Sequence, residues 1–451
     1  MYIIIVGAGE VGTHLAELLS TEQHDVAVID SMPERVRQIS TQLDVLAIEG
    51  TGVSTSVLQR AGIEQADLLL AVTNDDEVNI VVSALAKRMG VENTVVRIHN
   101  RELREDNREF VLSLSRADQV IDPDTSIADA VVRLLKYRGA LNVTELAGGE
   151  LLLLGAWVTE DSPIKGQTLS ELAKARPEQW NHLFVGLTHD GQTSIPRGNA
   201  SIEVGDQVRV LCTRKAGPEV TRMLGMATHN PKHVLLLGGG DISELVAQRI
   251  QYRVRKLFII ERNLERAQYL EENLPAAIVL HGDIADIELL EEADIQRADS
   301  VVALTGEDAA NITACLYAKQ AGAQETIAVV HRLSLLPMMK HAGIDAAISP
   351  RTSSADAVLQ LVHKGITSIS TFLDSEIELV ELEVPVDNPM AGQRLMDMHL
   401  PKDVLIGAVV IDGKVEIARG ITTIPAGGHI IVICPPERIE DIRKAFCEPG
   451  T

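Results

Sequence analysis

The chain has 451 residues, of which 45% are hydrophobic, and its formal net charge is −23 at pH 7. This length is enough for about three or four domains with buried cores. The excess of 64 acidic over 41 basic residues, together with only 3% aromatic residues, disfavours nucleic-acid binding. Because no apolar run approaches the roughly 18 residues of a membrane span and no signal-peptide pattern opens the chain, we expect a soluble cytoplasmic protein.

An apolar strand at the amino terminus runs straight into a glycine loop, IIIVGAGEVG, over residues 3–12. The following stretch carries apolar residues at helical spacing, and a second strand, DVAVID, ends at Asp30. Further short apolar strands at 43–48, 67–72 and 94–98 are separated by helical stretches. Strands that alternate with helices predict a parallel sheet covered on both faces.

The glycine loop matches the G-x-G-x-x-G pattern of dinucleotide-binding folds in its expected setting between a strand and a helix. Gly7 permits the tight turn, Gly9 lets a pyrophosphate approach the backbone, and Gly12 lets the helix pack against the strand. The helix N-terminus offers N–H groups and partial positive charge to phosphates. Asp30 can accept hydrogen bonds from both ribose hydroxyls and would repel a 2′-phosphate, which favours NAD or NADH over NADP.

Other candidates for this first site lie in the loop and at the ends of the predicted strands, where ligands bind in such folds. Arg97 closes the strand TVVRI and is suited to bidentate contact with a phosphate. A turn-forming role is an alternative for the residues after the fourth strand. These further candidates are Ala8, Glu10, Val11, Thr51, Thr73, Asn74 and Arg97.

Beyond the predicted sheet, a helix near 126–137 leads into a segment of different character. Short strands joined by turn signals such as HDGQ (189–192), with a short helical stretch between them, predict a small α+β lobe. The stretch GMATHNPKH (225–233) carries glycine, proline and polar residues and predicts the boundary between two halves.

The second half repeats the first. Gly7 aligns with Gly238 and Asp30 with Glu261, and ADLLLAVTNDDEVN (66–79) aligns with ADSVVALTGEDAAN (298–311). The fold class predicted from this duplication is α/β, with two tandem Rossmann-like doubly wound parallel sheets, each followed by a small α+β lobe. The predicted domains are 1–141 (nucleotide-binding, with crossover helix), 142–228 (lobe), 229–371 (nucleotide-binding) and 372–451 (lobe).

The second loop, GGGDIS, is an altered copy. Its serine is small enough for close packing, and Glu261 keeps a ribose-binding carboxylate, but Asp241 adds negative charge unless it is solvated or bridged. Val329 stands where the first half has Arg97. Two interpretations stay open, a second nucleotide site and a structural turn kept from the duplication. Its candidate residues are Gly238, Gly240, Asp241, Ser243, Glu261 and Asp283.

Catalytic groups are not indicated by any pattern in the chain. His99 and His331 occupy equivalent positions after a strand, which suits hydrogen bonding or packing as well as acid–base chemistry. Four widely spaced cysteines give no zinc or disulfide pattern, and no P-loop or nucleophile elbow is present. We therefore expect binding without turnover. The alternatives are an NAD-dependent oxidoreductase and a redox-sensing transcription regulator, for which no basic DNA-binding element is visible.

Several stretches carry a family resemblance: MYIIIVGAGEVGTHLAELL, AVTNDDEVN, RIH, and the lobe SPIKGQTLSEL followed by VGLTHDGQTSIPRGNASIEVGDQVRVLC. Together they resemble the TrkA family, the cytoplasmic nucleotide-binding subunits of bacterial Trk potassium uptake, built from tandem regulator-of-K⁺-conductance (RCK, or KTN) domains. The resemblance covers essentially the whole chain and departs from the pattern at GGGDIS and Val329.

The resemblance implies a non-enzymatic protein that binds NAD(H) or ATP/ADP and converts nucleotide state into pore opening. It also implies a location peripheral to the inner face of the cell membrane, without membrane insertion, and a TrkH/TrkG-like potassium-translocating partner. Similar proteins form dimers and tetramers by pairing crossover helices, here near 126–137 and 353–364. Arg97 is the residue that the resemblance assigns to a triphosphate.

Overall fold

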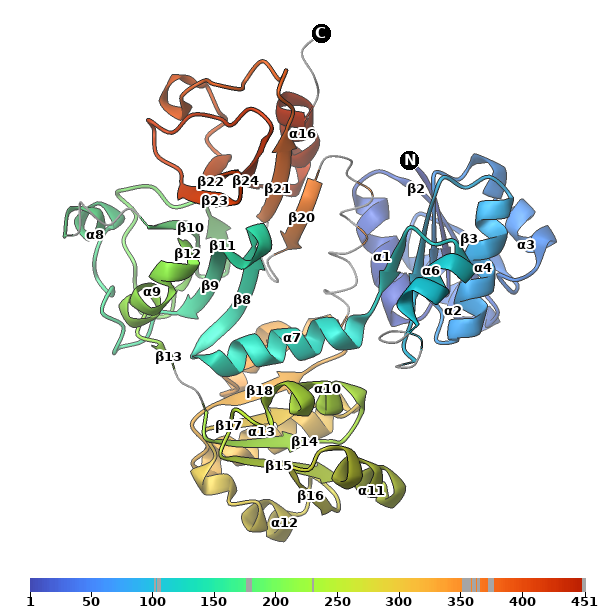
Figure 1. The fold of residues 1–451 in the computed structure, drawn as a ribbon, viewed down its shortest axis with the longest axis horizontal. Coiled ribbons are helices and arrows are strands. Elements are labelled where there is room, and N and C mark those ends of the chain that lie inside the picture. Colours follow the sequence, from blue (N-terminus) through green and yellow to red (C-terminus); the bar gives the residue numbers. More distant parts are fainter. Residues whose placement is uncertain are drawn as a thin grey trace. The chain divides into compact units, whose positions relative to one another are not determined.

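The computed structural model describes residues 1–100, 103, 107–175, 181–228, 231–350, 358, 362, 366–371 and 377–447 (Figure 1). Its contacts divide the chain into two compact units. The first comprises Met1–Ser126 with Pro350–Val362, and the second comprises Ile127–Ser349 with His363–Thr451. Apart from 358 and 362, the expected second crossover helix lies outside the described residues. No helix in the described ranges is long and apolar enough to cross a membrane.

A parallel six-stranded sheet forms the centre of the first unit, in the order β3-β2-β1-β4-β5-β6. This is the order of dinucleotide-binding folds, in which the crevice lies where the order reverses, between β1 and β4. The strands are β1 (Tyr2–Val6), β2 (Asp25–Asp30), β3 (Leu46–Glu49), β4 (Leu68–Ala71), β5 (Asn93–Arg97) and β6 (Gln119–Ile121). The helices between them are α1 (Glu10–Thr21), α2 (Pro33–Gln42), α3 (Thr55–Arg60), α4 (Asp76–Arg88) and α6 (Arg108–Ser115).

The second unit contains a copy of this sheet, in the order β16-β15-β14-β17-β18-β19. Its strands are β14 (His233–Leu237), β15 (Lys256–Glu261), β16 (Ile278–His281), β17 (Ser300–Ala303), β18 (Thr326–Val329) and β19 (Ala346–Ile348). Its helices are α10 (Asp241–Ile250), α11 (Leu264–Asn273), α12 (Ile287–Glu292), α13 (Asp308–Ala321) and α14 (Met339–Ala342).

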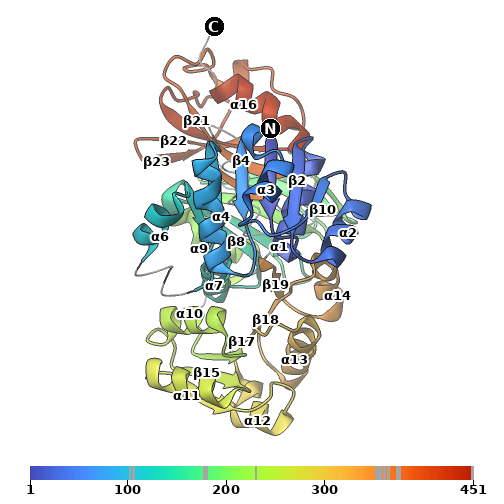
Figure 2. The same ribbon diagram turned by 90° about the vertical axis from the view of Figure 1, so that its right-hand side faces the viewer.

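Both faces of this second sheet are buried, which explains why its strands are apolar at every position rather than at alternate ones. Leu236, on β14, packs in one cluster with Val246 of α10, whereas the neighbouring Leu235 packs with Cys315 of α13. Figure 2 shows α10 and α11 on one side of the sheet and α13 on the other.

Two antiparallel five-stranded sheets form the lobes of the second unit. The first has the order β11-β10-β12-β9-β8 and carries α8 (Leu169–Ala175) and α9 (Gly217–Met223). The second has the order β20-β21-β24-β22-β23 and carries α16 (Ile439–Cys447). The strands are β8 (Ala140–Leu146), β9 (Leu151–Trp157), β10 (His182–His189), β11 (Gln192–Ser194), β12 (Gln207–Thr213), β20 (Ile366–Thr371), β21 (Glu378–Val384), β22 (Leu405–Ile411), β23 (Lys414–Ile417) and β24 (Gly428–Cys434).

These two lobes share a buried cluster that includes Leu153 and Leu211 from the first and Leu379 and Ile431 from the second. Apolar faces of two antiparallel sheets are buried in this way when they pack on each other. A two-stranded ribbon, β7 (Tyr137–Arg138) with β13 (Ala227–Thr228), lies at the ends of the first lobe.

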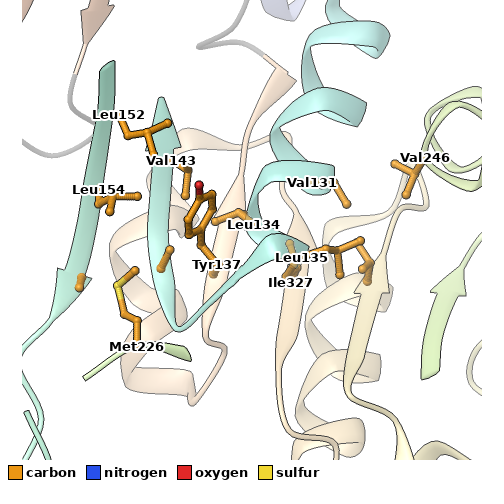
Figure 3. Packing of buried hydrophobic residues seen from close by; sticks show 14 of the residues in the cluster. Val131, Leu134, Leu135, Tyr137, Val143, Leu152, Leu154, Met226, Val246 and Ile327 are labelled. Carbon is orange, nitrogen blue, oxygen red and sulfur yellow. The ribbon is translucent and has the colours of Figure 1, made fainter. Parts of the chain in front are cut away.

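The helix α7 (Pro123–Lys136) leads from the first parallel sheet into the second unit. Its residues Val131, Leu134 and Leu135 are buried in a cluster that contains Leu154 of the first lobe and Ile327 of the second parallel sheet (Figure 3). Hydrophobic burial on two sides therefore fixes α7 between these two parts of the second unit.

The tandem Rossmann-like architecture with two α+β lobes confirms the predicted fold class. The four domain boundaries stay a prediction. The division by contacts is different, because it assigns α7 from Ile127 onward to the second unit rather than to the first nucleotide-binding domain.

Candidate nucleotide-binding sites

The first glycine loop joins β1 to α1 at the point where the strand order reverses. Gly7 has a φ of +110°, in the left-handed region that side chains disfavour. A Cβ on Gly12 would lie 1.8 Å from the carbonyl oxygen of Gly7, so only glycine lets α1 begin this close to the strand. Gly9 caps α1, and a Cβ there would meet nothing closer than Nη1 of Arg35, at 4.0 Å. The first N–H groups of α1 have no intrahelical acceptors.

Asp30 lies at the end of β2, and its carboxylate is held by the backbone. One oxygen accepts a 2.6 Å hydrogen bond from N–H of Ala8, and the other accepts a 2.8 Å bond from N–H of Met32. Its side chain is 7% exposed, and Nη1 of Arg35 lies 3.7 Å from it. A carboxylate has about four lone-pair positions. Asp30 thus ties the glycine loop to β2 and keeps acceptor capacity for ribose hydroxyls.

Asn79, which sequence reasoning missed, connects the ends of β4 and β5. Its side-chain oxygen accepts hydrogen bonds from N–H and Oγ1 of Thr73, at 2.9 and 2.7 Å. Its amide nitrogen donates to the carbonyl oxygens of Thr73 and Arg97, both at 3.0 Å. Asn311 makes the same four bonds in the second half. The asparagine at the same place in both copies of the repeat is the signal that could have identified it.

Arg97 lies half-buried at the carboxyl end of β5. Burial lowers the pKa of its guanidinium, and the charges of Asp124, Asp76 and Glu10 partly oppose that shift. Within the described residues, its buried Nε finds no hydrogen-bond acceptor, and Nη1 reaches Oδ1 of Asn74 only at 3.5 Å. A buried guanidinium nitrogen without an acceptor is a position where an anion stabilises the site.

The remaining candidates for the first site differ in whether the structure exposes or buries them. Glu10 and Asn74 are exposed near the loop and the strand end, whereas Val11 is buried in the core beneath α1. Thr51 is exposed beyond β3, and its carbonyl oxygen accepts a hydrogen bond from N–H of Ser54. The structure therefore brings Asp30, Arg97 and the glycine loop to one edge, while Val11 has a packing role.

His99 sits beside a structural carboxylate. The carboxylate of Asp76 accepts backbone hydrogen bonds from N–H of His99 and Asn100, at 3.0 and 2.7 Å. Burial by itself would raise the pKa of Asp76, but the nearby His99 side chain and these backbone hydrogen bonds lower it. Asp308 holds His331 in the same way. The backbone of each histidine is therefore tied to a carboxylate. The ring Nδ1 of His331 bonds to Asp308 at 3.0 Å, whereas that of His99 lies 3.4 Å from Asp76 and has no hydrogen-bond partner among the described residues.

The second loop opens onto a cavity of about 390 Å³. Gly238, the counterpart of Gly7, also has a positive φ, of +99°. Glu261 accepts a 2.6 Å hydrogen bond from N–H of Gly239. The cavity is lined by Gly238, Gly239, Gly240, Ile260, Glu261, Arg262, Asp283, Ile284, Leu304, Thr305, Gly306, Glu307 and Ala310. Two predicted residues, Asp241 and Ser243, are not among the lining residues.

The charge of Asp241 is bridged in the structure. Nη2 of Arg266 lies 3.2 Å from Asp241 and 2.8 Å from Glu244, a carboxylate that is 4% exposed. Ser243 is fully buried, and in the described part of the chain its hydroxyl has no hydrogen-bond partner. Val329 is buried and apolar. The second site thus keeps the loop and the ribose carboxylate but has no counterpart of the Arg97 charge.

Comparison with known proteins gives the family. The model of the TrkA-N domain matches residues 3–123 and 234–350, which contain the two glycine loops, and that of the TrkA-C domain matches residues 156–225 and 379–446. The chain belongs to the TrkA family. The Trk system potassium uptake protein TrkA of Azorhizobium caulinodans is 33% identical over 99% of this chain and 98% of its own. The TrkA homolog of Archaeoglobus fulgidus is 33% identical over 99% of this chain and 100% of its own.

Solved structures show that this chain shares the RCK fold. The GsuK RCK domain has a TM-score of 0.63 and 17% identity over 98% of this chain and 94% of its own. The GsuK channel bound to NAD has the same TM-score and identity and covers 98% of this chain and 78% of its own. Relatives over the whole length of this TrkA-family chain are named as potassium uptake proteins, which makes it a transport protein rather than an enzyme.

Proposed function

We propose that the chain is a nucleotide-binding regulatory subunit of a potassium uptake system and that it opens or closes a membrane pore in response to NAD(H) and ATP or ADP. The observation that carries this proposal is the first glycine loop, where the N-terminus of α1 and the Asp30 carboxylate lie together and a Cβ on Gly9 would meet nothing closer than Arg35 at 4.0 Å. The names of the relatives support potassium uptake as the process.

The proposed partner is a potassium-translocating membrane subunit of the TrkH/TrkG type, and the proposed assembly is a dimer or tetramer at the inner face of the cell membrane. A nucleotide can shift such an assembly only through different affinities for its two shapes. NADH and ATP must therefore arrange the first site differently, and Arg97 is the residue we assign to the triphosphate.

Blocking each loop in turn tests where nucleotides bind. A Cβ at Gly240 meets nothing within 4 Å, and one at Gly9 meets only Nη1 of Arg35, so Gly9→Leu and Gly240→Leu fill the phosphate space without disturbing the backbone. Calorimetric titration should show NADH and ATP competing at the first site, with Gly9→Leu abolishing that site and no nucleotide consumed. Unchanged binding in Gly9→Leu, or turnover of NADH, would contradict the proposal.

The same titration decides between the two interpretations of GGGDIS. Loss of a second binding event in Gly240→Leu identifies an occupied second site. A single site per chain that is insensitive to Gly240→Leu favours a turn retained from the duplication.

A further inference from the structure

Each half carries an arginine at the same aligned position, but the two side chains have different contacts. Arg35, the third residue of α2, aligns with Arg266, the third residue of α11. Both helices follow the strand that ends at the ribose carboxylate, so both guanidinium groups can reach their glycine loop. The surroundings of the two side chains differ.

In the second half the arginine is fully engaged. Nε of Arg266 donates to the carbonyl oxygen of Gly239 at 2.8 Å, and Nη2 pairs with Asp241 and with the buried Glu244. Its guanidinium also lies over the ring of Tyr269, at 4.9 Å. A phosphate would have to displace two carboxylates to bind this group.

In the first half the described residues do not hold Arg35 in this way, although Glu10 stands where the second half has Asp241. Thr13 replaces Glu244, and its hydroxyl donates to the carbonyl oxygen of Ala8, the counterpart of Gly239, at 3.2 Å. Among the described residues, the one ion pair of Arg35 is with Asp30, at 3.7 Å, and the side chain is 42% exposed. Its Nη1 lies 4.0 Å from where a Cβ of Gly9 would stand, beside the N-terminus of α1.

We propose that Arg35 binds the phosphates of the nucleotide in the first site. In the second site, the ion pair with Glu244 holds Arg266 so that it does not bind phosphates. This inference rests on the proposed function, because it assumes that the first loop holds a nucleotide. With Arg35 on the ribose side and Arg97 at the strand end, the first site presents two cations to a polyphosphate. The residue that decides this difference is the one in the first turn of the loop helix, threonine or glutamate.

The experiment uses the full chain carrying Gly240→Leu, so that only the first site is measured. NADH fluorescence reports binding, and ADP and adenosine are the competitors. Arg35→Ala should weaken ADP binding by roughly tenfold or more, the range of a charge-assisted hydrogen bond, and leave adenosine binding unchanged. Thr13→Glu should produce the same selective loss, because it recreates the acidic partner that holds Arg266.

The matched control is Arg37→Ala, which removes the same charge from an exposed position on the same helix. It should change neither affinity. Unchanged ADP binding in Arg35→Ala overturns the inference, and so does an equal loss for ADP and adenosine, which would mean that Arg35 only shapes the loop. If the chain that carries Gly240→Leu alone binds neither NADH nor ADP, the proposed function itself fails.

Discussion

At the scale of single residues, the site depends on polar groups that serve the fold and the ligand together. Asp30 receives two backbone hydrogen bonds and is nearly buried, so its carboxylate is already held in place before a nucleotide arrives. Its place was predictable from the sequence, because an acidic residue at this distance from a glycine loop has a known use. The hydrogen bonds of Asn79 and the ion pairs of Arg266 could not be predicted from the sequence, since both join positions far apart in the chain.

Replacing Asp30 by alanine should weaken NADH binding by roughly ten- to a hundredfold, which corresponds to about 1.5–3 kcal/mol for hydrogen bonds to a charged acceptor. Calorimetric titration measures this change. Glu261→Ala is the matched variant for the second site. An unaltered NADH affinity in Asp30→Ala would mean that the first loop is not the main site.

At the scale of elements, apolar strands bounded by turns predicted both parallel sheets and the two lobes. The crossover helix was expected near 126–137, and α7 spans Pro123–Lys136, because proline at the first helical position starts the helix three residues earlier. Its contacts could not be predicted in the same way. The pattern shows that Val131 and Leu135 share a face, but only the fold shows that this face meets the second sheet.

The burial of α7 predicts a stability effect. Leu135 is 3% exposed and packs in the cluster that joins the second sheet to the first lobe (Figure 3). Leu135→Ala should lower the free energy of unfolding by about 2–5 kcal/mol, the usual range for a buried leucine. Denaturant titration measures it. Val132→Ala, a partly buried neighbour, serves as the control, and an equal effect in both variants would contradict the packing described for Leu135.

At the scale of the whole chain, the duplication makes two sheets and two lobes without making two equal sites. Val329 stands where the first half has Arg97, and Arg266, the counterpart of Arg35, is paired with Glu244. A further difference is Glu325, which is 1% exposed and stands where the first half has Asn93. Its carboxylate accepts hydrogen bonds from Ser300 of the second sheet and from N–H of Gly139 before the first lobe, at 2.8 and 3.2 Å.

Glu325 makes the stability of the second unit dependent on pH. Burial raises the pKa of its carboxyl to about 7 from 4.5; Asp345 adds to the rise, while the hydrogen bonds from Ser300 and Gly139 and the charge of Arg138 oppose it. Because the folded state holds its proton more tightly than the unfolded state, this contribution is fully present below about pH 4.5 and is lost as the pH rises through 7. Glu325→Gln should remove that part of the slope in unfolding titrations. An unchanged slope would show that Glu325 is not the titrating group.

The most direct test of the account is potassium flux through vesicles that contain the pore subunit with this chain bound. We predict that NADH and ATP change the flux in opposite directions and that Gly9→Leu removes both responses while the complex stays assembled. Equal flux with and without nucleotides, or nucleotide responses that persist in Gly9→Leu, would contradict the claim that the first glycine loop is the sensor.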